Sequence, residues 1–250
     1  KMVEPYYKTE NFILYKGDCR EVLLALPEAS VDLVFADPPY NLSNGGITCY
    51  AGRMVSVNKG EWDKSRGVEN DHKFTIEWLE ACRRVLKPNG TVWVSGTMHN
   101  IYSIGFALQK LGYRLLNDIS WFKPNASPNL SCRFFTHSHE TVLWAAKSEK
   151  SKHKFNYTVT RKMAGGKQMR SVWFDITGEE IGIDIWSLPT PPLEEKVFGK
   201  HPTQKPLALL ERIVLATTDL GDAVLDPFAG SSTTGVACLK HGRHFIGVET

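Results

Sequence analysis

The stretch from Val31 to Asn41 ends in residues that suit a binding site better than a buried strand. Its first half is apolar, and it continues through Asp37, two prolines and Tyr40. Proline fixes φ and has no N–H, so Pro38 and Pro39 should end the strand in a rigid turn. In an open parallel sheet, ligands bind at the carboxyl ends of the strands. We therefore predict that Asp37 and Tyr40 lie at a ligand site.

A second stretch, Leu225 to Gly235, passes from a strand into a helix through small residues. Such residues let a ligand approach the backbone, and the first turn of a helix offers free N–H groups. The stretch is neither a Walker loop nor a full G-x-G-x-x-G pattern. Glu249 should end the next strand, where an acid can bind the two hydroxyl groups of a ribose. The alternative for Glu249 is an edge-strand acid that faces water.

A third stretch, Lys200 to Pro206, has the composition of a helix start. Pro206 suits the first turn, and Thr203 or Gln204 can cap it. A helix N-terminus with Lys205 beside it suits a small carboxylate. A plain capping turn explains the same residues equally well.

Together, three motifs resemble the beta-class DNA amino-methyltransferases: Asp37 to Tyr40, His201 to Pro206, and Asp226 to Gly230. That family uses S-adenosyl-L-methionine (AdoMet) to methylate the exocyclic amine of adenine or cytosine. The resemblance covers nearly the whole chain. The tract Ser43 to Ile47, with Gly60 to Lys64, is similar to the second adenine methylases of GATC-recognising restriction systems. The family often has glycine where Ser232 stands.

The resemblance implies roles for the residues of the first turn. Asp37 and the Pro38 carbonyl would accept hydrogen bonds from the target amine, with Pro39 keeping the turn rigid. Tyr40 would offer a face for stacking of a flipped-out base. We expect no metal site.

The resemblance also implies the residues that bind AdoMet. Asp18 would accept a hydrogen bond from the adenine amino group of the donor, and Glu249 would hold the ribose. Lys205, Thr203 and the loop from Ser231 to Thr234 would hold the methionine part. The expected set is Asp18, Thr203, Lys205, Asp226, Phe228, Ala229, Gly230, Ser231, Ser232, Thr233 and Glu249.

The expected activity is site-specific transfer of a methyl group to adenine N6 in DNA, with GATC as the site that the resemblance suggests. A cytosine-N4 methyltransferase is the nearest alternative, although cytosine-specific relatives more often have serine where Asp37 stands. A catalytically silent DNA-binding subunit of the same fold is another. A nucleotide-binding oxidoreductase using Gly230 to Gly235 would leave the Asp-Pro-Pro-Tyr turn unexplained.

The elements around these motifs alternate between strand and helix, which predicts an α/β sandwich with a mainly parallel sheet. Two consecutive strands, at 113–122 and 141–146, have only a loop between them and should form a hairpin, with one antiparallel strand at an edge. The resemblance specifies the fold further. It implies a Rossmann-like AdoMet-dependent methyltransferase fold with seven strands and a circularly permuted motif order, in which the strand ending at Asp226 lies beside the one ending at Ala36.

We predict three regions along the chain. Residues 1–146 form the catalytic half, including a loop at 41–70 that is either functional or a disordered insertion. Residues 147–200 form an inserted DNA-recognition region, and 201–250 form the AdoMet-binding half. The insert is rich in basic residues, which either face solvent or contact phosphates. The expected DNA contacts are Lys152, Lys154, Arg161 and Lys162.

Composition narrows the setting. The 250 residues carry a net charge of +3, which permits nucleic-acid binding without requiring it. No apolar run is long enough to span a membrane. Five scattered cysteines fit a reducing cytosol, so we expect a cytoplasmic protein. The resemblance implies that it acts on DNA. The sequence leaves open whether single-stranded DNA is also bound, whether the chain forms a homodimer, and whether a cognate restriction endonuclease accompanies it.

Overall fold

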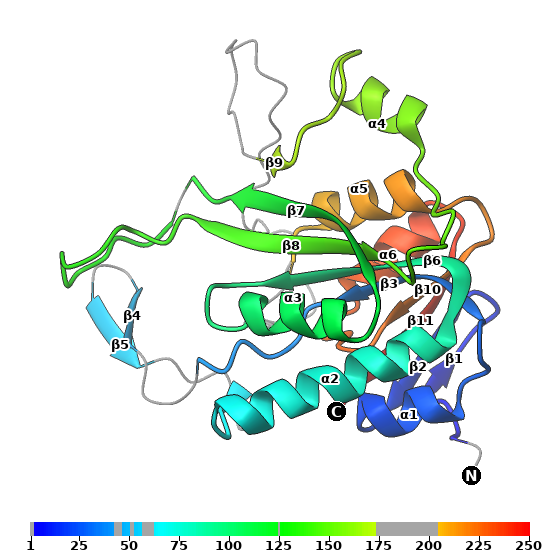
Figure 1. Cartoon of the computed structure of the whole chain (residues 1–250), viewed down its shortest axis with the longest axis horizontal. Helices are drawn as coiled ribbons and strands as arrows, with labels where there is room; N and C mark the ends of the chain where they lie inside the picture. The colour runs from blue at the N-terminus through cyan, green and yellow to red at the C-terminus, as the bar shows by residue number, and fades with distance from the viewer. Residues whose placement is uncertain (1–2, 43–46, 51–52, 57–62, 125, 174–204) are drawn as a thin grey trace.

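The computed structural model is an α/β sandwich, and it describes residues 3–42, 47–50, 53–56, 63–124, 126–173 and 205–250 (Figure 1). A mixed sheet forms the middle layer, and helices cover both of its faces. The helices are α1 (Cys19–Ala25), α2 (Val68–Val85), α3 (Ile101–Lys110), α4 (Tyr157–Met163), α5 (Leu207–Thr217) and α6 (Thr233–Lys240).

The main sheet has the strand order β1-β2-β11-β10-β3-β6-β8-β7-β9. Seven longer strands make up its body, as the resemblance implied, and the two-residue strands β1 and β9 extend its edges. The strands are β1 (Tyr7–Lys8), β2 (Phe12–Lys16), β3 (Val31–Ala36), β6 (Leu86–Gly96), β7 (Arg114–Phe122), β8 (His139–Ala146), β9 (Val172–Trp173), β10 (Ala223–Asp226) and β11 (His244–Glu249).

The hairpin of β7 and β8 is confirmed, but its antiparallel strand is not at the edge. β8 pairs antiparallel with both β6 and β7, so it lies between them. β7 therefore runs parallel to β6, outside β8. The sequence indicates that the two strands pair with each other, because only a loop separates them, but it does not indicate which of them also pairs with β6.

One strand contains residues that usually form turns. β6 begins at Leu86, directly after α2 ends at Val85, so Pro88 to Gly90 lie inside the strand. In addition, the expected loop at 41–70 contains a small antiparallel hairpin, β4 (Ile47–Tyr50) and β5 (Arg53–Ser56). Short segments between glycines give too little periodicity for a sequence pattern to predict these strands.

Each face of the sheet has its own apolar core. On one face, α1, α2 and α3 pack on the strands around the fully buried Trp78. On the other face, α5 and α6 pack around Phe245 and Trp121. Burial of large apolar side chains on both faces fixes the relative positions of the strands, and therefore of the turns that leave their ends. No described helix has the length and hydropathy needed to cross a bilayer.

Candidate functional site

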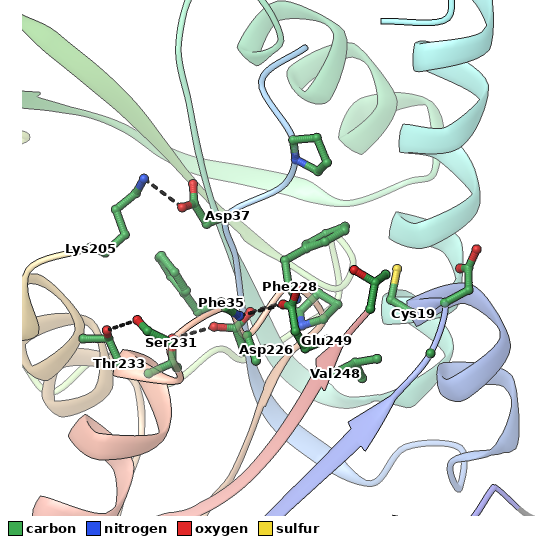
Figure 2. Close-up of a pocket in the computed structure, with 18 of the residues that line it drawn as sticks. Cys19, Phe35, Asp37, Lys205, Asp226, Phe228, Ser231, Thr233, Val248 and Glu249 are labelled. Carbon is green, nitrogen blue, oxygen red and sulfur yellow. Dashed lines mark hydrogen bonds and ion pairs between the residues drawn. The ribbon is translucent and has the colours of Figure 1, made fainter. Parts of the chain in front are cut away.

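The two turns singled out in the sequence lie next to each other at one edge of the sheet. β3 and β10 pair in parallel, with Leu33 opposite Val224 and Val34 opposite Leu225. The strands therefore end side by side, at Asp37 and Asp226. This adjacency confirms the expected arrangement, and it creates one pocket to which both turns contribute (Figure 2).

The Asp37 carboxylate is held by three side chains from different parts of the chain. Its Oδ1 accepts hydrogen bonds from the Tyr40 hydroxyl at 2.7 Å and from the Ser95 hydroxyl at 2.6 Å. Its Oδ2 lies 2.8 Å from the Lys205 ammonium, and the two side chains are 12% and 8% exposed. Figure 2 shows this ion pair among the residues that line the pocket. These three side chains thus hold Asp37 in one orientation.

A second carboxylate, Glu140, completes a charge-balanced cluster. The Lys205 ammonium lies 3.4 Å from its Oε2, and Lys123 forms an ion pair with its Oε1. Burial alone would raise the pKa of Glu140, but the charges of Lys205 and Lys123, with hydrogen bonds from Lys123 and Tyr40, lower it to about 2. Burial lowers the pKa of Lys205, and Asp37 and Glu140 reverse this, so that its pKa is raised. Two carboxylates and two ammonium groups therefore neutralise one another.

The backbone of the first turn is held by another buried acid, Asp63. Its Oδ1 accepts from the N–H groups of Tyr40 and Asn41, both at 2.9 Å, and its Oδ2 accepts from Leu42 N–H at 3.2 Å. Asp63 is 0% exposed. Asn41 has a left-handed φ of 59°, which turns these consecutive N–H groups toward one carboxylate. The turn is therefore held by Asp63, which lies 23 positions after Tyr40 in the sequence.

Tyr40 differs from the role that the resemblance gives it. Its side chain is 6% exposed, and its hydroxyl accepts from Lys205 at 2.8 Å and contacts Glu140 at 3.2 Å. Burial, followed by the charges of Asp37 and Glu140, raises the pKa of Tyr40 well above its ordinary value. In this conformation the ring is packed beneath the turn, and the hydroxyl acts as a hydrogen-bond donor to Asp37.

The second turn is held mainly by its own residues. The Asp226 carboxylate accepts from Phe228 N–H at 3.0 Å and from the Thr234 hydroxyl at 2.6 Å. Glu249 Oε2 accepts from Gly230 N–H at 2.8 Å, which joins the turn to the end of β11. Burial raises the pKa of Asp226 to about 7, because its hydrogen bonds only partly offset the loss of water and the charges of Asp37 and Glu249 act in the same direction.

Ser232 occupies a left-handed backbone position, with φ of 59°. Glycine adopts this region without steric cost, whereas a residue with a Cβ is destabilised there. This conformation gives a physical reason for the glycine that the family often has at this position. The serine here therefore strains the backbone at the start of α6.

Asp18 lies at the far end of the pocket, where it caps α1. Its Oδ1 accepts from Arg20 N–H at 2.9 Å, and its Oδ2 lies 2.6 Å from the Arg20 guanidinium. The hydrogen bond from Arg20 is the main cause that lowers the pKa of Asp18. Arg20 also pairs with Glu77 at 2.6 Å and lies over the Phe74 ring. Both Arg20 and Phe74 line the pocket, and the sequence analysis missed them.

The pocket brings together most of the residues expected to bind AdoMet. Of the residues expected to bind AdoMet, the lining includes Asp18, Lys205, Asp226, Phe228, Ala229, Gly230, Ser231, Thr233 and Glu249. Of the expected catalytic residues it includes Asp37 and Pro39, and Ser232 is not part of it. Thr203 lies outside the described residues. Lys205, expected at the methionine part of the donor, lines the pocket and pairs with Asp37.

Several residues of the cluster had no role in the sequence analysis: Ser95, Lys123, Glu140 and Asp63. Glu140 had a usable signal, because it is an acid at the start of a long apolar strand, and a buried acid requires a partner. Asp63 lies in the Gly60 to Lys64 tract that carries part of the resemblance, but nothing in the sequence connects it to the turn at Tyr40. Among the described residues, no group of His, Cys, Asp and Glu has the arrangement of a metal site.

The basic insert begins at the end of the sheet opposite to the pocket, where the parallel strands start. Lys152 N–H donates to Asn89 at the start of β6, and Lys154 pairs with Asp219 at 2.6 Å and Asp222 at 2.8 Å, just before β10. These partners precede strands whose far ends carry the site. Lys152 and Lys154 therefore lie at the opposite end of the strands from Asp37 and Asp226. The reason is that β8 runs antiparallel and delivers the chain to the opposite edge.

Comparisons with known proteins agree on one family. A family model described as DNA methylase matches residues 31–250. The type II methyltransferase M2.DpnII of Streptococcus pneumoniae is 49% identical over 249 residues, covering 99% of this chain and 88% of that protein. M2.MboI of Moraxella bovis, also a type II methyltransferase, is 45% identical over 249 residues, with 99% and 86% covered.

Solved structures show the same fold. The crystal structure of an M1.HpyAVI–SAM complex is similar with a TM-score of 0.64 and 28% identity, covering 96% of this chain and 93% of that one. The PvuII cytosine-N4-specific DNA methyltransferase has a TM-score of 0.71 at 24% identity, covering 99% and 85%, and this likeness concerns the fold alone.

Proposed function

The chain belongs to the DNA methylase family, and from this premise we propose that it transfers a methyl group from AdoMet to N6 of adenine in DNA, at GATC sites. The observation that carries the proposal is the adjacency of the two turns. The turn at Asp37 presents hydrogen-bond acceptors for an amine. The turn at Asp226 lines the adjacent pocket together with the acid Glu249. The type II relatives support a place in a restriction-modification system.

The residues of the pocket fit AdoMet. Glu249 uses Oε2 for the Gly230 N–H, which leaves Oε1 for hydroxyl groups of a ribose. Phe228 meets Trp78 edge-on, with 5.3 Å between ring centroids, and this packing holds an aromatic wall beside the Gly230 loop. Asp18, beyond it, can accept from the amino group of an adenine. When bound, AdoMet supplies an activated methyl group on a sulfonium.

The first turn solves the other half of the reaction, because an aromatic amine delocalises its lone pair into the ring. Hydrogen bonds from the amine to the Asp37 carboxylate and the Pro38 carbonyl would localise that pair and aim it at the donor. Asp37 is already oriented by Ser95, Tyr40 and Lys205, so little reorganisation is needed. Asp37 acts here as an acceptor and need not be a strong base. The amine nitrogen becomes acidic as the N–C bond forms and the S–C bond breaks, and its proton would then pass to the Asp37 carboxylate.

The target adenine must leave the duplex to reach this pocket. The side chain of Tyr40 is buried, so we propose that its role is to orient Asp37. Stacking of the flipped base then requires another surface or a movement of the Tyr40 ring. We propose the same three regions along the chain as before. The catalytic half comprises residues 1–146, the insert residues 147–200 and the AdoMet-binding half residues 201–250.

The partners follow from the same premise. We infer double-stranded DNA as the substrate, a cognate restriction endonuclease that cuts the unmodified site, and a cytoplasmic location where both meet the DNA. Size-exclusion chromatography with light scattering, with and without DNA, decides between a monomer and a homodimer.

Incubation with plasmid DNA and methyl-labelled AdoMet, followed by mapping of modified bases, tests the proposed function. We expect N6-methyladenine in GATC. Label in N4-methylcytosine would overturn the assignment of the base, label in adenines elsewhere would overturn the site, and the absence of label would overturn the activity.

The proposed DNA contacts of the insert can be separated in two double variants. Arg161 and Lys162 lie exposed on α4, whereas Lys154 is already paired with two acids. If Arg161 and Lys162 contact phosphates, their replacement by alanine lowers the salt dependence of DNA binding by about two in slope. The matched Lys152→Ala, Lys154→Ala variant should leave the slope unchanged, and an equal change in both would contradict this division.

A further inference from the structure

The loop between β7 and β8 exposes large apolar side chains to solvent. Phe135 is 96% exposed, Phe134 59% and Leu130 45%. Scattered exposed apolar residues are common, but two consecutive phenylalanines at a loop tip are not, because exposing their rings to water is unfavourable. We refer to residues 126–138 as the aromatic loop. Its exposed rings indicate a surface that is covered in a complex.

The aromatic loop is internally braced. Asn129 Nδ2 donates to the Phe134 carbonyl at 2.6 Å, and Asn129 Oδ1 accepts from the N–H and hydroxyl of Ser131 at 3.0 and 2.7 Å. The ring of Phe134 meets that of His137, with 5.5 Å between centroids. At the base, Lys123 N–H donates to the Ser138 carbonyl at 2.7 Å. These bonds hold the tip in one shape while Phe135 points outward.

The loop grows from the same edge of the sheet as the site. β7 runs parallel to β3 and ends at Phe122, so the loop leaves the edge at which Asp37 lies. Lys123, the first residue after β7, pairs with Glu140 in the charge-balanced cluster. Figure 1 shows the loop reaching well beyond the ends of the neighbouring strands. A molecule that binds at Asp37 and extends along this edge would meet the loop tip.

The charge of this segment suits a polyanion. Residues 123–139 include Lys123, Arg133 and two histidines, and they contain no Asp or Glu. Arg133 directly precedes the two phenylalanines and is exposed. Cations beside exposed aromatic rings are the pattern of surfaces that bind nucleic acids by phosphate contact and base stacking. The observations therefore favour DNA over a protein partner.

We propose that Phe135, supported by Phe134, enters the DNA duplex beside the target adenine and stacks in the space that the flipped base leaves. Arg133 would contact the adjacent phosphate. This inference rests on the proposed function, because the wedge is needed only if a base is extruded. Stacking on an inserted ring offsets part of the cost of unstacking the duplex.

The test compares Phe135→Ala with the wild type on duplex DNA that carries one GATC site. We expect methyl transfer to fall about 10- to 100-fold, since loss of one stacking contact has an effect of this order. Affinity for AdoMet should not change. Tyr6→Ala is the matched control, because Tyr6 is 73% exposed and lies near β1, at the opposite side of the sheet. It should retain wild-type activity.

Two further measurements distinguish a wedge from a structural residue. Phe135→Trp should restore transfer, since another aromatic ring can stack. A substrate with the target adenine mispaired should rescue Phe135→Ala, because its base is cheaper to extrude. Equal activity of Phe135→Ala and wild type on paired DNA, or an equal deficit on paired and mispaired DNA, would overturn the wedge. A wild-type chain that methylates neither substrate would instead overturn the proposed function.

Discussion

The two turns that meet at this edge of the sheet are held in different ways. The donor turn, Asp226 to Thr234, is fixed by bonds among its own residues and by the neighbouring end of β11. The acceptor turn, Asp37 to Tyr40, is fixed by residues distant in sequence, namely Ser95, Glu140, Lys205 and Asp63. The donor turn is thus a local structure, and the acceptor turn depends on the completed fold.

The difference fits the two tasks. A cofactor pocket needs a stable backbone loop and one or two side chains that bind polar groups. An amine acceptor must be oriented precisely, because catalysis by positioning is lost with small displacements. Three hydrogen-bonding partners around Asp37 provide that precision. The four predictions below separate the two turns by measuring methyl transfer and AdoMet binding independently.

The largest effect is expected for Asp37→Ala. Transfer should fall by about 1000-fold, because the amine loses its charged acceptor. AdoMet affinity, measured by calorimetry, should stay close to wild type, since the donor turn is intact. Asp37→Asn keeps the size of the side chain and serves as the packing control, with a similar loss expected. A parallel loss of AdoMet binding in both variants would show that the two turns are not independent.

Asp63→Ala should reduce kcat by about 10- to 100-fold without weakening AdoMet binding. Three N–H groups of the acceptor turn lose their partner, and the turn relaxes away from the productive geometry. Asp63→Asn keeps one oxygen for the N–H groups of Tyr40 and Asn41, so its kcat should lie between that of the wild type and that of Asp63→Ala. If kcat is unchanged in a folded Asp63→Ala protein, the acid has only a structural role.

Glu249→Gln should act on the donor turn alone. The amide keeps one oxygen for the Gly230 N–H or for a ribose hydroxyl but loses the charge, so the Kd for AdoMet should rise about 10-fold. At saturating AdoMet, the rate of transfer should match wild type. A lower saturated rate with unchanged affinity would assign Glu249 to the acceptor turn instead.

The smallest effect is expected for Ser232→Gly, which removes a Cβ from a left-handed position. Urea unfolding should show a gain of up to about 1 kcal/mol, since the relief of strain exceeds the added freedom of glycine in the unfolded chain. Kinetic constants for DNA should not change. Destabilisation by this substitution would mean that the serine side chain supports the turn.

The local nature of the donor turn explains why it could be predicted. A strand end, a turn and a helix start are already predicted by the order Asp226-Pro227-Phe228-Ala229-Gly230, and Glu249 ends the next strand. The parallel sheet follows from the alternation of elements. By contrast, the partners of the acceptor turn come from β6, β8 and the start of the 205–250 segment, and their convergence depends on the strand order.

The failures have the same origin. The position of β8 inside the sheet could not be derived from the sequence. It determines both that Glu140 reaches the Tyr40 hydroxyl and that Lys152 and Lys154 lie at the opposite end of the strands. A basic run in the sequence carries no information about which edge it reaches. Tyr40 was assigned by resemblance to stacking, and only its packing reveals its hydrogen bond to Asp37.

The crystal structure of the chain with bound AdoMet would test most directly whether the two turns form one reaction site. We expect the ribose at Glu249, and we expect the sulfonium methyl to face Asp37 across a gap that fits a flipped amine. Reacting atoms in such a gap should come to about 3–3.5 Å of each other once the base is bound. AdoMet bound with its methyl group turned toward α1, away from Asp37, would contradict the account.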